Sequence, residues 1–150
     1  MGKIKITLED LFNLPGAEIF NPDAYKPLSL LEIDSRKVKK GSLFVAIKGD
    51  RYDGHDFILD ALKKGASAVV IDSRKLKKFS FLEIPLITVP DTTKAYGEIA
   101  NIWRKKLPAK VISITGSNGK TTVKEMVSVL LEEKYAVIKT EANNNNHVGV

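Results

Sequence analysis

The residues with the clearest chemical signature form the run Thr115-Gly116-Ser117-Asn118-Gly119-Lys120-Thr121-Thr122. Its two glycines allow the backbone to curl, so that successive amides point at phosphate oxygens. Lys120 can reach the β- and γ-phosphates of a nucleotide, and the Thr121 hydroxyl is placed to bind Mg²⁺. We therefore predict that Lys120 is catalytic and that ATP is bound by the whole loop, namely Gly116, Ser117, Asn118, Gly119, Lys120, Thr121 and Thr122.

A strand, this loop and a helix follow one another in the order that phosphate binding needs. The loop is a short variant, because Ile114 stands where the standard motif has its first glycine. The apolar, partly β-branched segment 111–115 predicts a buried strand, and a helix is expected from Lys120 to about Glu133. A hinge at 107–110 divides the chain into domains 1–109 and 110–150. The second is expected to be the beginning of a parallel-sheet ATPase domain, truncated at Val150.

Residues 1–109 alternate between helix and strand patterns, which predicts a small α/β domain. Thr7 is expected to cap a helix over 8–12, and a turn-rich stretch is expected to follow to about Pro27. Strands are predicted over 42–47, 66–71 and 87–89. Helices are predicted over 55–64, ended by Gly65, and from the N-cap Asp91 to about 107.

Composition narrows the chemistry that the chain can perform. Its 150 residues include no cysteine, which excludes disulfides, thiolate metal ligands and cysteine catalysis. Apolar runs are short and no signal-peptide pattern is present, so we expect a cytoplasmic protein without membrane insertion. The net charge of +6 favours anions, but the basic runs 74–78 and 104–106 are interpreted as solvated faces and turns. Nucleic-acid binding is not expected, because the aromatic residues are not interleaved with basic ones.

The short phosphate loop resembles that of the Mur ligases, ATP-dependent enzymes that form amide bonds in peptidoglycan synthesis. The segments Asp34-Ser35-Arg36-Lys37-Val38, 41–49 and 53–57 are similar to the UDP-binding domain of that family. The resemblance covers nearly the whole chain and implies that residues 1–109 bind a UDP-muramoyl peptide. Ser35, Arg36, Lys48 and His55 would contact or shape its nucleotide end, although His55 could equally serve only to order its loop.

Two later segments look most like the Mur ligases that join D-alanyl-D-alanine to UDP-N-acetylmuramoyl-tripeptide: 123–126 and 143–150. The resemblance implies that Thr140 and the segment containing Asn143, Asn145 and Asn146 line the space between ATP and the muramoyl peptide. Ala142 departs from the glycine that is common in the family, which affects the conformation of this loop. His147 has no partner at metal-ligand spacing, so no histidine metal site is predicted.

The implied reaction is attack of the substrate carboxylate on the γ-phosphate of ATP, which gives an acyl phosphate and releases ADP. The amino group of D-alanyl-D-alanine then captures the acyl group, and phosphate leaves. Lys120, the loop amides and Mg²⁺ held through Thr121 would stabilise the phosphoryl group during transfer. A monomer is expected. Three alternatives stay open: the neighbouring Mur ligase that adds the third amino acid, a non-catalytic module binding a UDP-sugar or nucleotide, and, as a minor hypothesis, a basic nucleic-acid binder.

Overall fold

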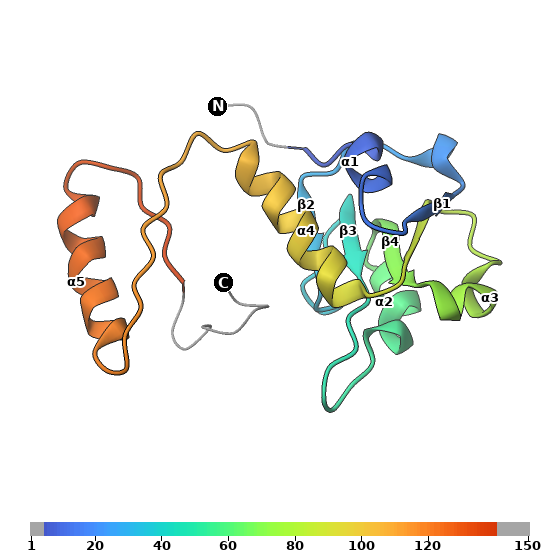
Figure 1. Cartoon of the computed structure of the whole chain (residues 1–150). Helices are drawn as coiled ribbons and strands as arrows, with labels where there is room; N and C mark the ends of the chain where they lie inside the picture. Colours follow the sequence, from blue (N-terminus) through green and yellow to red (C-terminus); the bar gives the residue numbers. More distant parts are fainter. Residues whose placement is uncertain (1–4, 141–150) are drawn as a thin grey trace. The chain divides into compact units, whose positions relative to one another are not determined.

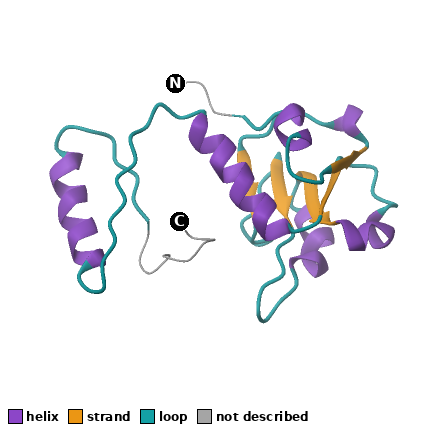
Figure 2. Cartoon of the chain, in the orientation of Figure 1, coloured by secondary structure: helices purple, strands orange, loops and turns teal. Residues whose placement is uncertain are grey.

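The computed structural model describes residues 5–140, which belong to two compact units dividing between Leu107 and Pro108 (Figure 1). The first unit is a sheet with helices on both faces, so the predicted α/β class is confirmed (Figure 2). The second unit has one helix as its only regular element among the described residues. Within residues 5–140 no helix combines the length and the apolar character that crossing a membrane requires.

The sheet of the first unit has five strands in the order β1-β5-β4-β3-β2. Neighbouring strands from β2 to β5 are parallel, and β1 pairs antiparallel with β5 at one edge. The central strands β3, β4 and β5 are mostly apolar, and all but one of their residues are buried, because helices cover both of their faces. The strand bounds are Glu18–Phe20 (β1), Leu30–Glu32 (β2), Ser42–Val45 (β3), Ala66–Asp72 (β4) and Leu86–Val89 (β5).

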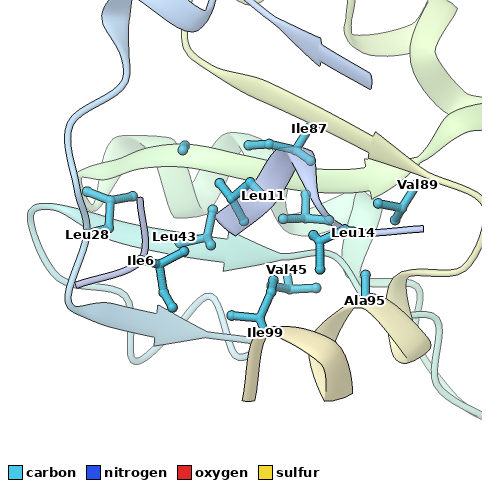
Figure 3. Close-up of a cluster of buried hydrophobic side chains, with 12 residues drawn as sticks. Ile6, Leu11, Leu14, Leu28, Leu43, Val45, Ile87, Val89, Ala95 and Ile99 are labelled. Carbon is cyan, nitrogen blue, oxygen red and sulfur yellow. The ribbon is translucent and has the colours of Figure 1, made fainter. Parts of the chain in front are cut away.

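Each face of the sheet packs against its own pair of helices. On one face α1 (Leu8–Phe12) and α4 (Thr92–Lys105) bury alternate strand residues such as Val45 and Ile87 (Figure 3). On the other face α2 (Ile58–Lys63) and α3 (Leu76–Phe79) pack on the intervening residues, including Phe44. This alternation follows from the period of two along a strand.

The helices begin where polar side chains cap them. Thr7 and Asp10 form a capping box at α1, and the Asp91 carboxylate accepts hydrogen bonds from the amides of Thr93 and Lys94 at α4, so both predicted N-caps are confirmed. The helix expected from residue 55 begins instead as a 3₁₀ turn, η2 (Gly54–Phe57), capped by Asp53. It continues as α2 and ends before Gly65, whose φ of 99° agrees with the predicted stop.

Several expectations need correction. The turn-rich stretch contains η1 (Pro22–Ala24) but also the short strand β1, and β2 was not predicted. The strand predicted over 42–47 ends at Val45. The basic run at 74–78 overlaps η3 (Ser73–Lys75) and α3, and it is only partly a solvated surface, because Lys75 pairs with Asp53.

In the second unit α5 spans Lys120–Glu132, within one residue of the prediction. The buried strand predicted over 111–115 is wrong, since this segment pairs with no strand among residues 5–140. Val111 is 63% exposed and Ile112 is 60% exposed. An extended apolar segment becomes a strand only when a neighbouring segment pairs with its backbone groups, and none of the described residues provides that partner.

Candidate functional site

The carboxyl ends of β2, β3, β4 and β5 meet at one edge of the sheet, because these strands are parallel. Ligands of open parallel sheets bind at this edge. A cleft of about 440 Å³ opens there, which we call the carboxyl-edge cleft. Its lining comes from the last residue of β4 and from the segments that follow β3, β4 and β5: Lys48, Asp53, His55, Asp72, Arg74, Lys75, Pro90, Asp91, Thr92 and Thr93.

The loop that follows β3 folds back onto the strand it leaves. The amide of Gly54 donates a hydrogen bond of 2.8 Å to the carbonyl oxygen of Ile47, and Lys48 forms a β-bridge with Asp53. A Cβ atom on Gly54 would lie 2.7 Å from that carbonyl oxygen, so only glycine permits this approach. The fold-back brings Asp53 and His55 to the cleft beside Lys48.

His55 lies at the base of the cleft with an exposed fraction of only 3%. Its Nδ1 is 2.5 Å from the Asp53 carboxylate, and its Nε2 accepts a hydrogen bond of 3.0 Å from the backbone amide of Asp72. The ring stacks on Phe79. Burial lowers the pKa of His55, although the carboxylate of Asp53 acts in the opposite direction. The ring is therefore neutral at neutral pH.

Both carboxylates next to His55 are bound by cations. Burial alone would raise the pKa of Asp53, but hydrogen bonds from Lys75 and His55 outweigh burial and hold that pKa well below its usual range. The guanidinium of Arg74 binds both oxygens of Asp72 and lowers its pKa to about 2. These groups form a connected, ionised network along one wall of the cleft.

Lys48 is the cation of the cleft that has no carboxylate partner among residues 5–140, and it is exposed. Lys75 and Arg74 already bind Asp53 and Asp72, while Asp91 caps α4. An anionic ligand entering the cleft would therefore find its first uncommitted positive charge on Lys48.

Ser35 and Arg36 lie in the turn that follows β2, at the same edge of the sheet but outside the lining of the cleft. Arg36 is exposed and its guanidinium binds Asp34, with an Nη2 to Oδ2 distance of 2.7 Å. That contact lowers the pKa of Asp34 to about 2. Since a guanidinium carries five donors, Arg36 can hold Asp34 and still reach an anion.

The predicted phosphate loop precedes α5 in the second unit. Gly116 and Gly119 have φ values of 152° and 75°, which favour glycine. No side chain among the described residues caps the amino end of α5, so its first amides face solvent. The Lys120 ammonium donates a hydrogen bond of 2.6 Å to the carbonyl oxygen of Gly116. Ser117, Asn118, Thr121 and Thr122 are exposed beside it.

The remaining predicted site residues lie close to or beyond the end of the described segment. Thr140 is exposed, and its carbonyl oxygen accepts a hydrogen bond of 2.5 Å from Lys124 on α5. Asn143, Asn145 and Asn146, together with Ala142 and His147, lie outside the described residues.

Sequence reasoning overlooked most of the cleft. Asp72, Arg74, Lys75 and the start of α4 were not among the predicted site residues. Asp72 is the last residue of the buried strand β4, and the others follow β4 or β5. The rule that parallel strands direct their carboxyl ends to one edge is the signal that could have identified them.

Comparisons with known proteins point to one family. The profile described as Mur ligase family, catalytic domain, matches residues 27–104, and the profile described as Mur ligase middle domain matches residues 114–150. The chain is 39% identical over 147 residues to the UDP-N-acetylmuramoyl-tripeptide–D-alanyl-D-alanine ligase of Escherichia coli K12, covering 98% of this chain and 31% of the relative.

Solved structures agree. A crystal structure of MurF from Acinetobacter baumannii superposes with a TM-score of 0.80 at 29% identity, covering 99% of this chain and 32% of that one. MurF ligase from Thermotoga maritima, in complex with ADP, superposes with a TM-score of 0.70 at 34% identity, covering 80% of this chain and 27% of that one. The chain thus spans about a third of the length of the relatives that it matches.

Proposed function

The chain belongs to the Mur ligase family, and from this premise we propose that it forms part of an ATP-dependent ligase that adds D-alanyl-D-alanine to UDP-N-acetylmuramoyl-tripeptide. The observation that carries the proposal is the geometry of the phosphate loop: two glycines with positive φ, an uncapped helix end and a lysine held over the loop. The similarity to a relative named for this substrate pair supports the choice of acceptor.

ATP would bind at the phosphate loop of the second unit. The exposed amides at the start of α5 and the ammonium of Lys120 would receive its phosphate oxygens. The Thr121 hydroxyl, in the first turn of α5, is our candidate ligand for Mg²⁺, which would neutralise charge on the phosphates. The similarity to the MurF ligase from Thermotoga maritima, which was solved in complex with ADP, supports an adenine nucleotide as the ligand.

The nucleotide end of the muramoyl peptide would bind at the carboxyl edge of the first sheet. Lys48 and Arg36 supply exposed positive charge for a diphosphate, and Ser35 supplies a hydroxyl. His55 is too buried to reach a ligand, so we assign it to the support of this edge. We propose Asn143, Asn145 and Asn146 as contacts of the muramoyl peptide on the resemblance alone.

In the proposed reaction the terminal carboxylate of the tripeptide attacks the γ-phosphate of ATP, so that ADP leaves and an acyl phosphate forms. The amine of D-alanyl-D-alanine then attacks the acyl carbon, loses a proton and expels inorganic phosphate as the amide bond forms. The chain's own contribution is alignment and neutralisation of charge. The side chain of Lys120 is flexible, so its ammonium would stay in contact with the phosphoryl group during the transfer. The loop amides would hold the phosphate oxygens in place.

Phosphate release by the full-length protein that carries this chain tests the proposal. The assay supplies Mg-ATP and UDP-N-acetylmuramoyl-tripeptide, with D-alanyl-D-alanine or a single amino acid as acceptor. We expect release that depends on the dipeptide. Release that instead requires a free diamino acid and a UDP-muramoyl-dipeptide would assign the neighbouring ligase, and binding without release would leave a non-catalytic module.

A further inference from the structure

We propose that His55 is a positioning residue: locked as its Nδ1-protonated tautomer, it joins the loop after β3 to the end of β4 and so fixes the carboxyl-edge cleft for a nucleoside diphosphate. The choice of ligand rests on the function proposed above. The tautomer and the joining of the two segments rest on hydrogen bonds within the first unit alone.

The partners of the imidazole determine which nitrogen carries its proton. The backbone amide of Asp72 can only donate, so Nε2 must offer a lone pair to it. The ionised carboxylate of Asp53 can only accept, so Nδ1 must carry the hydrogen. The opposite tautomer would set two hydrogens face to face at Asp72 and two acceptors face to face at Asp53.

The contact between Asp53 and His55 resembles the Asp-His pair of a catalytic triad, yet His55 cannot act as a catalytic base. A catalytic histidine needs its second nitrogen free for the reacting group, whereas Nε2 of His55 is occupied by a backbone amide at 3.0 Å. With 3% exposure, the ring is also out of reach of a ligand. Its effect must pass through the groups that it holds.

The groups that His55 holds form part of the wall of the carboxyl-edge cleft. Through Nδ1 the ring holds Asp53, which bridges to the backbone of Lys48 and binds the Lys75 ammonium. Through Nε2 it holds the backbone of Asp72, whose carboxylate orients Arg74. One buried ring therefore connects the uncommitted cation of the cleft with two of the ion pairs beside it.

Protonation of the ring would break the connection at one end. A hydrogen on Nε2 would face the amide hydrogen of Asp72, so that end must open. The charged groups that face the ring are the carboxylates of Asp53 and Asp72 and the ammonium of Lys75, and α3 contributes the uncharged ring of Phe79. Acid should therefore loosen the cleft at the end of β4, while the carboxylate of Asp53 keeps its contact.

The tautomer is measured directly by ¹⁵N NMR of the imidazoles in the protein. The signals of His55 are those that disappear in His55→Phe and remain in His147→Gln, the variant of the other histidine in this chain. We expect Nδ1 to carry the proton, and the neutral form to persist below the ordinary histidine pKa of about 6.5. An Nε2-protonated ring, or a ring exchanging freely between tautomers, would overturn the proposal.

The second measurement is the affinity for UDP, determined by calorimetry at neutral pH. We expect His55→Phe, which keeps the ring stacking but removes both nitrogens, to weaken UDP binding at least tenfold. His55→Gln, whose amide oxygen can accept from Asp72, should recover part of that loss. Phe44→Leu, a core change on the same face of the sheet, is the control for lowered stability and should keep the affinity of the unmodified protein.

The outcomes separate this inference from the proposed function. If the unmodified protein fails to bind UDP while its tautomer is the one proposed, the assignment of the nucleotide end to this edge fails. If UDP binds and His55→Phe binds it equally well, the positioning role is wrong. A parallel loss of affinity in Phe44→Leu would likewise reduce His55 to an ordinary core residue.

Discussion

The ammonium of Lys120 lies 2.6 Å from the carbonyl oxygen of Gly116, four residues earlier in the chain. The lysine thus folds back over its own loop. Its charge is placed near the amides at the start of α5, which point to solvent without a side-chain cap among the described residues. When a phosphate enters the loop, the Lys120 ammonium would leave the carbonyl oxygen of Gly116 and bind a phosphate oxygen instead. Binding therefore needs little rearrangement of the loop.

Replacement of this lysine should abolish ligation. We expect Lys120→Ala to lower ATP-dependent phosphate release by about a hundredfold or more, because a cation that neutralises the transferred phosphoryl group is lost. Affinity for the UDP-muramoyl peptide should not change. Lys134→Ala, at an exposed lysine beyond α5, is the matched control and should retain full release. Normal turnover in Lys120→Ala would remove the lysine from the mechanism.

Two glycines in the first unit should respond oppositely to alanine. Gly54→Ala places a Cβ 2.7 Å from the carbonyl oxygen of Ile47, so the free energy of unfolding should fall by about 1–3 kcal/mol. Gly97, exposed within α4, has no atom within 4 Å of an added Cβ. Gly97→Ala should therefore raise stability by about 0.4–1 kcal/mol. Urea unfolding of both variants measures the difference, and equal effects would contradict it.

The capping box of α1 supplies another stability test. The Thr7 hydroxyl accepts from the amide of Asp10 at 3.2 Å, and the Asp10 carboxylate accepts from the amide of Thr7 at 2.6 Å. Thr7→Ala should lower the free energy of unfolding by about 1 kcal/mol, whereas Thr7→Ser keeps the hydroxyl and should cost much less. Thermal unfolding compares the two, and similar losses in both would exclude the cap as the cause.

How far the sequence predicts the fold depends on how local each signal is. The caps Thr7 and Asp91 act within three residues, and both were found from the sequence. The strand β1 was missed because its three residues are too few to show an alternating pattern, and it exists only through pairing with β5. Segment 111–115 shows the converse, since its β-branched pattern is correct for a strand but no described segment pairs with it.

The same difference between local and long-range signals separates the two parts of the candidate site. The phosphate loop could be predicted because all of its residues are consecutive. The carboxyl-edge cleft could not, because its walls come from three strand ends that only the parallel register brings together. His55 illustrates the difference: its sequence context suggested ligand contact or loop order with equal weight, and only its burial and its two partners favour loop order.

The stability of the first unit should fall with acidification in two separate windows. Burial lowers the pKa of His55 in the folded state, so below about pH 6.5 the unfolded state binds the extra proton and stability declines as the pH falls. The Arg74 contact lowers the pKa of Asp72 to about 2, so its contribution is present above about pH 3.9 and is lost between there and pH 2. Both effects lower the free energy of unfolding as the pH falls.

The upper window isolates the histidine, because Asp72 stays ionised there. Between pH 5 and 6.5 the free energy of unfolding should rise with pH by up to about 1.4 kcal/mol per unit, which corresponds to one proton. Urea unfolding across this range measures the slope, and His55→Phe should remove it whereas His147→Gln should keep it. A slope that survives in His55→Phe would mean that another group titrates, and that the ring of His55 is not the buried neutral group described above.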